Sequence, residues 1–119
     1  MANFIGIPTP PSLQPKSRVH DLKLRLDWGE PALTIVDVRD RTAFNQEHIT
    51  GAISVPDADL LRILESSLEK ERDIYLYGET DDETAVSAES LRDAGYSAIA
   101  ELRGGLAAWK AVGYPTEVA

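Results

Sequence analysis

The sequence contains no cysteine among its 119 residues. Disulfide bonds, thiolate metal ligands and a thiol nucleophile are therefore excluded for this chain. Any reaction that passes through a covalent intermediate on one of the chain's own cysteines is excluded with them. No other single count narrows the possible functions as far.

Positive charge and long hydrophobic runs are also scarce. Twelve lysine and arginine residues face twenty aspartate and glutamate residues, which gives a net charge of −8. This surplus of acids raises the electrostatic cost of approaching a nucleic-acid backbone or an anionic lipid surface. No apolar run approaches the roughly 20 residues that span a bilayer, and the N-terminus lacks the pattern of a signal peptide. We therefore expect no nucleic-acid partner, no membrane and a cytoplasmic location.

What the sequence does contain is ordinary for one globular domain. Hydrophobic residues make up 43% and charged residues 27% of the chain, and this length suffices to bury well over half of the unfolded surface. Four of the seven prolines lie in the first fifteen residues. We expect residues 1–16 to form a Pro-rich arm and residues 17–119 to form the domain. The arm is either loose or docked through Phe4, Ile5 and Ile7, on the domain or on a neighbouring copy.

Segments of strand and helix pattern alternate along the rest of the chain. Strands are expected at residues 32–38, 52–56, 74–78 and 97–102, and helices at residues 18–28, 41–49, 57–71, 84–94 and 104–113. Ser17 and Asp57 are expected to cap two of these helices. Such alternation predicts an α/β fold, in which a parallel sheet is covered by helices and ligands bind at the carboxyl ends of the strands.

The segment IYLYGETDDET, residues 74–84, combines a buried strand with an acidic loop. Its glycine is followed by four carboxylates without a cation, namely Glu79, Asp81, Asp82 and Glu83. These acids could complement the N-terminus of the following helix, with Asp81 or Asp82 turned into its positive end. They could instead form a recognition surface for a basic segment of another protein. A divalent-cation site is the third interpretation, although the spacing matches no calcium loop.

Three stretches together resemble the rhodanese-like domain. DVRDRTAFNQEHITGA, residues 37–52, resembles the family pattern of Asp-Val-Arg, an aromatic residue and then His-Ile-x-Gly-Ala. The strand, loop and helix of residues 74–95 and the stretch LRGGLAAWKAVGYP, residues 102–115, are the other two. The resemblance covers about residues 17–115. It implies a parallel sheet of about five strands with helices on both faces.

The resemblance also points to what is missing. Rhodanese-like enzymes carry a catalytic cysteine directly after the central strand, in a loop resembling Cys-Arg-x-Gly-x-Arg-Ser. Laid on this chain, the pattern puts Gly78 at the cysteine and Glu79 and Glu83 at the two arginines. The thiolate that carries the persulfide and the cations that attract an anionic sulfur donor are both absent. Cysteine-dependent phosphatases of the same fold are excluded for the same reason.

Nearby hydroxyl groups offer no clear replacement for the cysteine. Thr80, Thr84 and Ser87 lie close in sequence, but the two histidines, His20 and His48, are the only bases that titrate near neutrality. His48 belongs to a stretch in which we expect it to fix a turn. An alternative hydroxyl nucleophile is therefore disfavoured.

The remaining motif residues are expected to be structural. Asp37 and Arg39 should pair at a strand end, two glycines should allow a close approach of the last helix, and a tryptophan should pack inward. The complete structural set is Asp37, Arg39, His48, Gly51, Gly104, Gly105 and Trp109.

Together these features predict a catalytically inactive rhodanese-like module that binds a protein partner or regulates one, with no metal and no cofactor. A basic segment of that partner is the expected point of contact. The alternative is a sulfurtransferase that acts only with a cysteine supplied by a partner. In either case the vestigial active-site loop consists of Gly78, Glu79, Thr80, Asp81, Asp82, Glu83 and Thr84.

Overall fold

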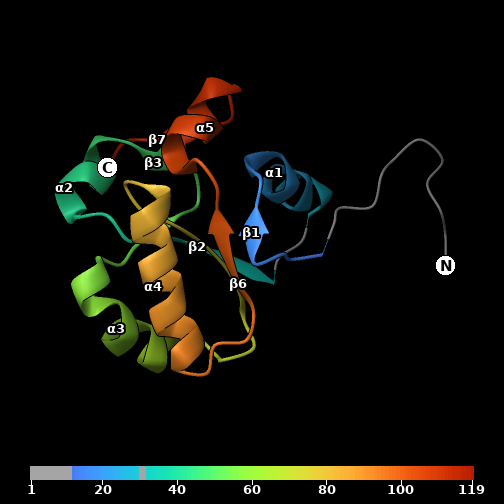
Figure 1. Cartoon of the computed structure of the whole chain (residues 1–119). Coiled ribbons are helices and arrows are strands. Elements are labelled where there is room, and N and C mark those ends of the chain that lie inside the picture. Colours follow the sequence, from blue (N-terminus) through green and yellow to red (C-terminus); the bar gives the residue numbers. More distant parts are fainter. Residues whose placement is uncertain (1–11, 30–31) are drawn as a thin grey trace, which may run out of the picture.

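The structure of the chain, a computed structural model, describes residues 12–29 and 32–119 (Figure 1). A five-stranded sheet in the order β1-β6-β5-β2-β4 forms its centre, and all neighbouring strands run parallel. Its strands are β1 (Lys16–Ser17), β2 (Leu33–Asp37), β4 (Ile53–Ser54), β5 (Asp73–Tyr77) and β6 (Ile99–Leu102). The α/β fold with a five-stranded parallel sheet is thereby confirmed.

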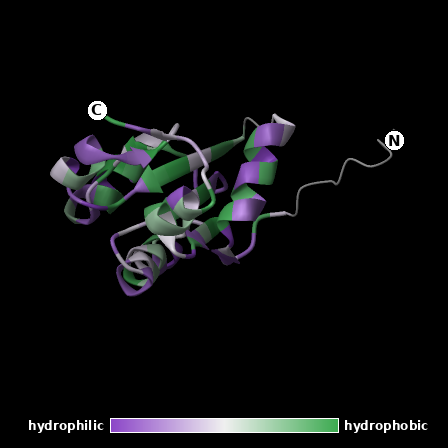
Figure 2. Ribbon diagram, turned by 90° about the horizontal axis from the view of Figure 1, so that it is seen from above, coloured by the Kyte–Doolittle hydropathy of each residue, from purple (hydrophilic) through white to green (hydrophobic). Residues whose placement is uncertain are grey.

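Helices lie on both faces of this sheet. They are α1 (Val19–Trp28), α2 (Arg41–Gln46), α3 (Leu60–Ser67), α4 (Asp81–Asp93), α5 (Gly105–Ala111) and the short 3-10 helix η1 (Asp57–Asp59). In Figure 2 the strands are largely hydrophobic, whereas the helices carry both hydrophilic and hydrophobic residues. Within the described ranges, no helix combines the length and the hydropathy that crossing a membrane requires.

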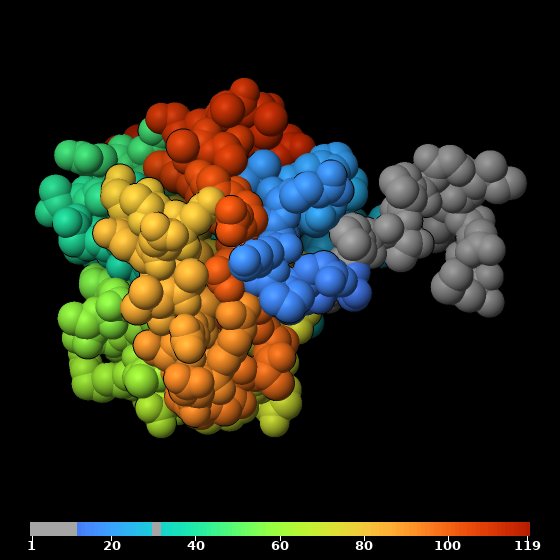
Figure 3. All heavy atoms as spheres, in the orientation of Figure 1, coloured from blue at the N-terminus to red at the C-terminus, as the bar shows by residue number. Residues whose placement is uncertain are grey.

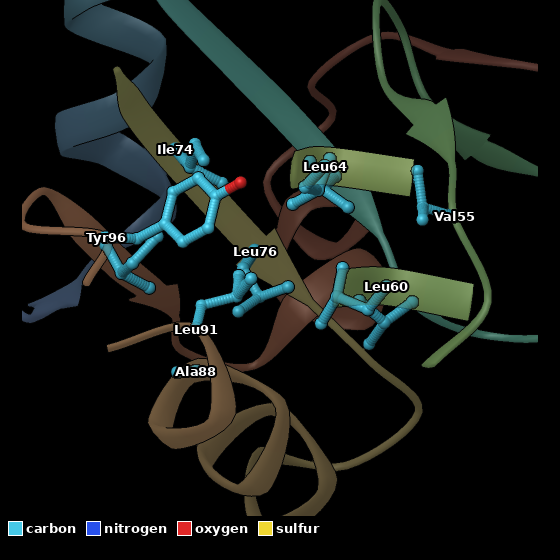
Figure 4. Close-up of a cluster of buried hydrophobic side chains, with 11 residues drawn as sticks. Val55, Leu60, Leu64, Ile74, Leu76, Ala88, Leu91 and Tyr96 are labelled. Atoms are coloured by element: carbon cyan, nitrogen blue, oxygen red, sulfur yellow. The ribbon is translucent and has the colours of Figure 1, made fainter. Parts of the chain in front are cut away.

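The central strand β5 divides the core into two clusters. Successive side chains of a strand point to opposite faces, so Ile74 and Leu76 pack under α3 and α4, while Tyr75 and Tyr77 pack towards α1 and α5. Figure 4 shows the first cluster, in which Leu76 lies between residues of the two covering helices. All four side chains of β5 named here are at most 1% exposed. The strand is therefore buried on both faces, as its unbroken apolar pattern predicts.

The helix expected at residues 41–49 is shorter than its sequence pattern indicates. α2 ends at Gln46, and His48–Ile49 forms the short strand β3. β3 pairs antiparallel with β7 (Thr116–Glu117) in a second, two-stranded sheet. The helix stops because a segment nearly seventy residues later supplies backbone partners, in the register His48 to Glu117.

Both of the expected helix caps are wrong. Ser17 belongs to β1, and its hydroxyl donates to the carbonyl of Arg18, which is the N-cap residue of α1 without a side-chain cap bond. Asp57 opens the 3-10 helix, and α3 begins only at Leu60, again without a side-chain cap bond. Pro56 directly precedes this irregular start, which separates Asp57 from the α-helix.

The sheet also begins earlier than the expected domain boundary. Lys16 pairs with Glu101 of β6, and the carbonyl of Pro15 accepts a hydrogen bond from the Glu101 amide at 2.8 Å. Lys16 therefore belongs to the sheet and not to the Pro-rich arm expected for residues 1–16. Most of that arm lies outside the described residues, including Phe4, Ile5 and Ile7.

Tyr96 brings a polar group into the cluster under α3 and α4. It is 2% exposed, and Figure 4 shows its ring beside Ile74 with the hydroxyl directed into the cluster. The described part of the chain offers this hydroxyl no hydrogen-bond partner. Burial, together with the charge of Glu65, raises the pKa of Tyr96. The hydroxyl therefore enters the core without the compensation that a buried polar group usually finds.

We expect Tyr96→Phe to raise the free energy of unfolding by about 1 kcal/mol, because it removes an uncompensated hydroxyl and keeps the ring. Tyr77→Phe is the matched control, since the Tyr77 hydroxyl accepts the backbone N–H of Ile49 at 3.1 Å. Its removal should lower the free energy of unfolding by about 1 kcal/mol. Urea unfolding of the three proteins measures both changes. Equal losses in the two variants would show that the Tyr96 hydroxyl does have a partner.

Candidate functional site

Three loops meet at the carboxyl edge of the sheet. Asp37 and Tyr77 are register partners at the ends of β2 and β5, and the N–H of Val38 donates to the Tyr77 carbonyl at 3.0 Å. The loop before α4 begins with Gly78, and the turn before α5 contains Gly104 beyond the end of β6. This is the edge at which parallel α/β sheets bind ligands.

The helix after the acidic loop starts three residues earlier than the sequence pattern predicts. α4 begins at Asp81 instead of about Thr84, with Thr80 as its N-cap residue. Asp81, Asp82 and Glu83 thus form the first turn of the helix. Acidic residues in a first turn are favourable because they complement the positive end of the helix dipole. The run of acids that resembles a loop is therefore compatible with helix.

Two threonine hydroxyls hold the loop in place. Thr80 Oγ1 accepts the N–H of Glu83 at 3.1 Å, which is the usual N-cap bond. Thr84 Oγ1 accepts the N–H of Gly78 at 2.8 Å and donates to the carbonyl of Thr80 at 2.9 Å. Thr84 is only 1% exposed. The N–H of Gly78, at the position where the resemblance puts the catalytic cysteine, is thus bound within the loop.

Asp81 reaches out of its own helix. Its Oδ1 accepts the N–H of Gly104 at 2.9 Å, and its Oδ2 lies 3.4 Å from Nε of Arg103. Gly104 is the N-cap residue of α5. The Asp81 carboxylate therefore joins the start of α4 to the turn before α5. The expectation that Asp81 turns into the N-terminus of its own helix is wrong. Asp82 points into solvent as an exposed residue.

A buried ion pair supports the turn after β2. Asp37 has no exposed side-chain surface, and Arg39 holds it with a forked contact, Nη2 to Oδ2 at 2.7 Å and Nε to Oδ1 at 3.1 Å. The Arg39 backbone N–H adds a bond to Oδ1 at 2.9 Å. Arg39 Nη2 also donates to the carbonyl of Glu47 at 2.7 Å. The pair therefore ties β2 to the end of α2.

Tyr77 lies against this ion pair. The Arg39 guanidinium stands 5.6 Å from the centre of the Tyr77 ring. Burial raises the pKa of Tyr77, and the Asp37 carboxylate raises it further. The phenol therefore stays neutral and acts as a structural hydrogen-bonding group, which accepts the N–H of Ile49.

Neither histidine lines the hollows at this edge. His48 is buried, its Nδ1 lies 2.9 Å from the Phe44 carbonyl, and its ring stacks on Phe44 with centroids 3.7 Å apart. Gly51, in the turn that follows, has a positive φ of 89° and donates its N–H to Glu117 Oε1. His20 lies on α1, with Nδ1 3.2 Å from the Tyr114 hydroxyl. Neither histidine therefore lies beside the hydroxyls of Thr80, Thr84 and Ser87 as a general base.

Two glycines bring α5 close to the loop of Gly78. A Cβ on Gly105 would lie 3.4 Å from the Gly78 carbonyl oxygen, and Gly105 has a positive φ of 51°. A Cβ on Gly104 would lie only 2.5 Å from the Cβ of Ala108. Trp109 is fully buried further along the helix, and its indole N–H donates to the Pro115 carbonyl at 2.8 Å. A side chain at Gly104 would therefore collide with Ala108, and at Gly105 the positive φ disfavours one.

The surface at this edge has two hollows that share Arg39 and Glu79. The larger one, of about 490 Å³, is called the carboxylate cleft here. Its lining residues are Val38, Arg39, Asp40, Asp57, Glu79, Glu83, Val86 and Ser87. The smaller one, of about 200 Å³, is lined by Arg39, Gly78, Glu79, Gly104, Leu106, Ala107 and Lys110. In Figure 3 the first turns of α4, in yellow, stand beside the green and teal segments that carry the other wall of the carboxylate cleft.

The lining of the carboxylate cleft includes Asp57 and Val86, which the sequence pattern does not indicate as site residues. Asp57 follows β4 just as Glu79 follows β5, and its Oδ1 accepts the hydroxyl of Ser87 at 2.6 Å. Ser87 lies four residues after Glu83, on the same side of α4. The parallel pairing of β2 with both neighbours could have indicated this meeting of strand ends. Val86 gives no such signal, because an exposed valine on a helix is common.

Within the described ranges, this edge holds no cluster of side chains placed to bind a metal ion. Among residues 12–29 and 32–119, no three histidine, cysteine, aspartate or glutamate side chains are placed to hold a metal ion. The divalent-cation interpretation of the acidic loop therefore has no ligand set in that part of the chain. What the edge offers is a concave surface with carboxylates, one paired guanidinium and short apolar side chains.

Comparison with known proteins shows to which family this chain is related. The family model described as rhodanese-like domain matches residues 18–112. The solution structure of the rhodanese-like domain of a protein from Anabaena sp. has a TM-score of 0.85 and 54% identity, and covers 90% of this chain and 81% of that one. The fold is thus shared with a solved rhodanese-like domain.

Two curated proteins are also similar over most of this chain. A protein from Allochromatium vinosum named sulfurtransferase is 32% identical over 94 residues, which are 79% of this chain and 86% of that protein. An uncharacterised protein from Synechocystis sp. is 38% identical over 89 residues, which are 73% of this chain. The chain spans about half of that second protein, 48% of its length.

The bridge made by Asp81 can be measured against its neighbour. We expect Asp81→Ala to lower the free energy of unfolding by about 1 kcal/mol more than Asp82→Ala, because only Asp81 accepts the Gly104 N–H. Both variants lose one first-turn carboxylate, so the dipole contribution cancels in the comparison. Urea unfolding at neutral pH gives the difference. Equal stabilities would mean that the Asp81 bridge contributes nothing in solution.

Proposed function

Because the chain belongs to the rhodanese-like domain family, we propose that it is a catalytically inactive member that acts by binding a protein partner or regulating one. The observation that carries the proposal is Gly78, at the position where the resemblance puts the catalytic cysteine, in a chain without any cysteine. A sulfane sulfur has no group on this chain to which it can be bound. The cytoplasmic location expected from the sequence stays a prediction.

The charge around Gly78 supports the same proposal. Glu79 and Glu83 stand where the resemblance puts two arginines, and both line the carboxylate cleft together with Asp57. Arg39 is the one cation of that lining, and its guanidinium is bound to Asp37. An anionic sulfur donor would therefore meet a negative surface where active relatives present a positive one. A cation or a basic segment would be attracted to it.

The rigid backbone of the loop after β5 is suited to binding a partner. The backbone of the loop is fixed by Thr80 and Thr84, and the neighbouring turn is tied by Asp81. A rigid loop loses little conformational entropy when a partner binds to it. The edge that serves catalysis in the active pattern can therefore serve recognition here.

We expect the purified chain to show no thiosulfate:cyanide sulfurtransferase activity above a protein-free control. The physical reason is the absence of a thiolate that could accept the sulfur. Thiocyanate formation, followed beside an active rhodanese at equal concentration, measures it. Turnover at a rate comparable to that enzyme would overturn the proposal.

We expect Gly78→Cys alone to restore little activity, because Glu79 and Glu83 would raise the pKa of the new thiol and repel the donor. The backbone permits the substitution, since Gly78 does not have a positive φ, but the new Cβ would lie 3.2 Å from Val38 Cγ2, so the Val38 side chain has to shift by a few tenths of an ångström. Adding Glu79→Arg and Glu83→Arg should raise the rate at least about tenfold.

The new thiol would be the chain's only cysteine, so its titration can be followed directly. The pH dependence of alkylation by iodoacetamide should give a pKa above the usual ~8.5 in Gly78→Cys and a lower one in the triple variant. Gly78→Cys with an ordinary family rate, or equal thiol pKa values in both variants, would show that the acids do not control this position.

A further inference from the structure

The carboxylate cleft carries a surplus of negative charge that the described residues leave without a cation. It has four acids in its lining, Asp40, Asp57, Glu79 and Glu83. No ion pair involving any of the four occurs within residues 12–29 and 32–119. Nearby Asp59, in contrast, is paired with Arg62 at 3.1 Å. Asp40 caps α2 by accepting the N–H of Ala43 at 2.8 Å, and Asp57 accepts the Ser87 hydroxyl, whereas the side chains of Glu79 and Glu83 have no hydrogen bond among the described residues. The carboxylates of Glu79 and Glu83 are therefore the most available to a partner.

Arg39 does not neutralise this surplus. Its guanidinium makes a forked contact with Asp37, so the two opposite charges cancel each other. Nη2 is bound in addition to the Glu47 carbonyl. The side chain of Arg39 is 9% exposed, and that of Asp37 is not exposed at all. The four carboxylates thus leave the cleft with a net charge of about −4 at neutral pH.

The cleft also has an apolar wall. Val86 of α4 is 64% exposed, and Val38, which is 6% exposed, lines the same hollow from the end of β2. A surface with apolar walls and carboxylates fits a side chain that combines an aliphatic stem with a cationic head. Simple metal ions do not fit this description, and no metal-binding group is placed there among the described residues.

We propose that the carboxylate cleft binds an arginine side chain in a basic segment of a partner protein. The inference rests on the proposed binding function and adds the place and the chemistry of the contact. The arginine stem lies on Val86 and Val38, and its guanidinium lies among Glu79, Glu83 and Asp57. A planar guanidinium can donate to two carboxylates at once, which an ammonium group does less well.

The surroundings favour a protein segment as the carrier of that arginine. The chain has a net charge of −8, which attracts a basic segment from a distance and raises the rate of encounter. Ser87 and the carboxylate of Asp57 are already bound to each other, so one rim of the cleft is fixed before binding. A cleft of about 490 Å³ accommodates one long side chain with part of its backbone.

The test is an NMR titration of the full chain, labelled with ¹⁵N, with an acetylated and amidated Ala-Ala-Arg-Ala-Ala peptide. The matched probe is the same peptide with citrulline in place of arginine, which has the same shape without the charge. We expect shifts concentrated on the amides of Glu79, Glu83 and Ser87, and an affinity at least about tenfold weaker for the citrulline peptide. Shifts that concentrate elsewhere, or that are equal for both peptides, overturn the proposal.

A pair of variants separates the cleft from the overall charge of the protein. Glu79→Gln with Glu83→Gln should weaken the arginine peptide about tenfold. Glu69→Gln with Glu71→Gln changes the net charge equally, but these acids precede β5 and lie at the opposite end of that strand. The second pair should change the affinity less than twofold. An equal loss in both pairs means unspecific attraction and overturns the proposal.

The result of the peptide titration is independent of the result of the sulfurtransferase assay. Sulfur transfer by the pure chain would remove the proposed function, whichever peptide binds. An inactive chain that fails to discriminate arginine from citrulline would remove only the carboxylate cleft as the contact site.

Discussion

The carboxylate of Asp37 is the constraint on which the edge of this sheet depends. It is completely buried at the end of β2, where an isolated charge would be costly, and Arg39 satisfies it through three hydrogen-bonding nitrogens, counting its backbone N–H. The same guanidinium holds the Glu47 carbonyl and faces the Tyr77 ring. The ion pair of Asp37 and Arg39 therefore connects the ends of β2 and β5 with the end of α2, and Arg39 also lines the carboxylate cleft.

This ion pair is separate from the chemistry that the family performs. Asp37, Arg39 and Tyr77 act here as structural groups, which hold the neighbouring backbone through hydrogen bonds and opposite charges. The backbone of the loop of Gly78 is held by Thr80 and Thr84, whose hydrogen bonds do not involve the side chains of Glu79 and Glu83. A fold of this kind holds its function in a few exchangeable side chains on a stable support.

Much of this architecture can be predicted from the sequence, for physical reasons that also explain the failures. β5 is recognisable because four buried residues in a row exclude a solvated face. The short strands β1, β3 and β7 have two residues each, so they show no periodicity, and their partners lie far away in sequence. The early start of α4 is hidden because first-turn acids resemble a polar loop. The bridge from Asp81 to Gly104 depends on tertiary structure alone.

The pairing of β1 with β6 has a consequence for association between copies of the chain. Without Lys16 and Ser17, β6 would be the outermost strand on its side and would present unpaired backbone groups to solvent. Bare edges of this kind act as templates for strands of other molecules and promote aggregation. Pro15 directly precedes β1 and has no backbone N–H with which to extend a ladder. The two-residue strand β1 and the proline before it thus cover the edge of the sheet beside β6 and disfavour the addition of another molecule's strand there.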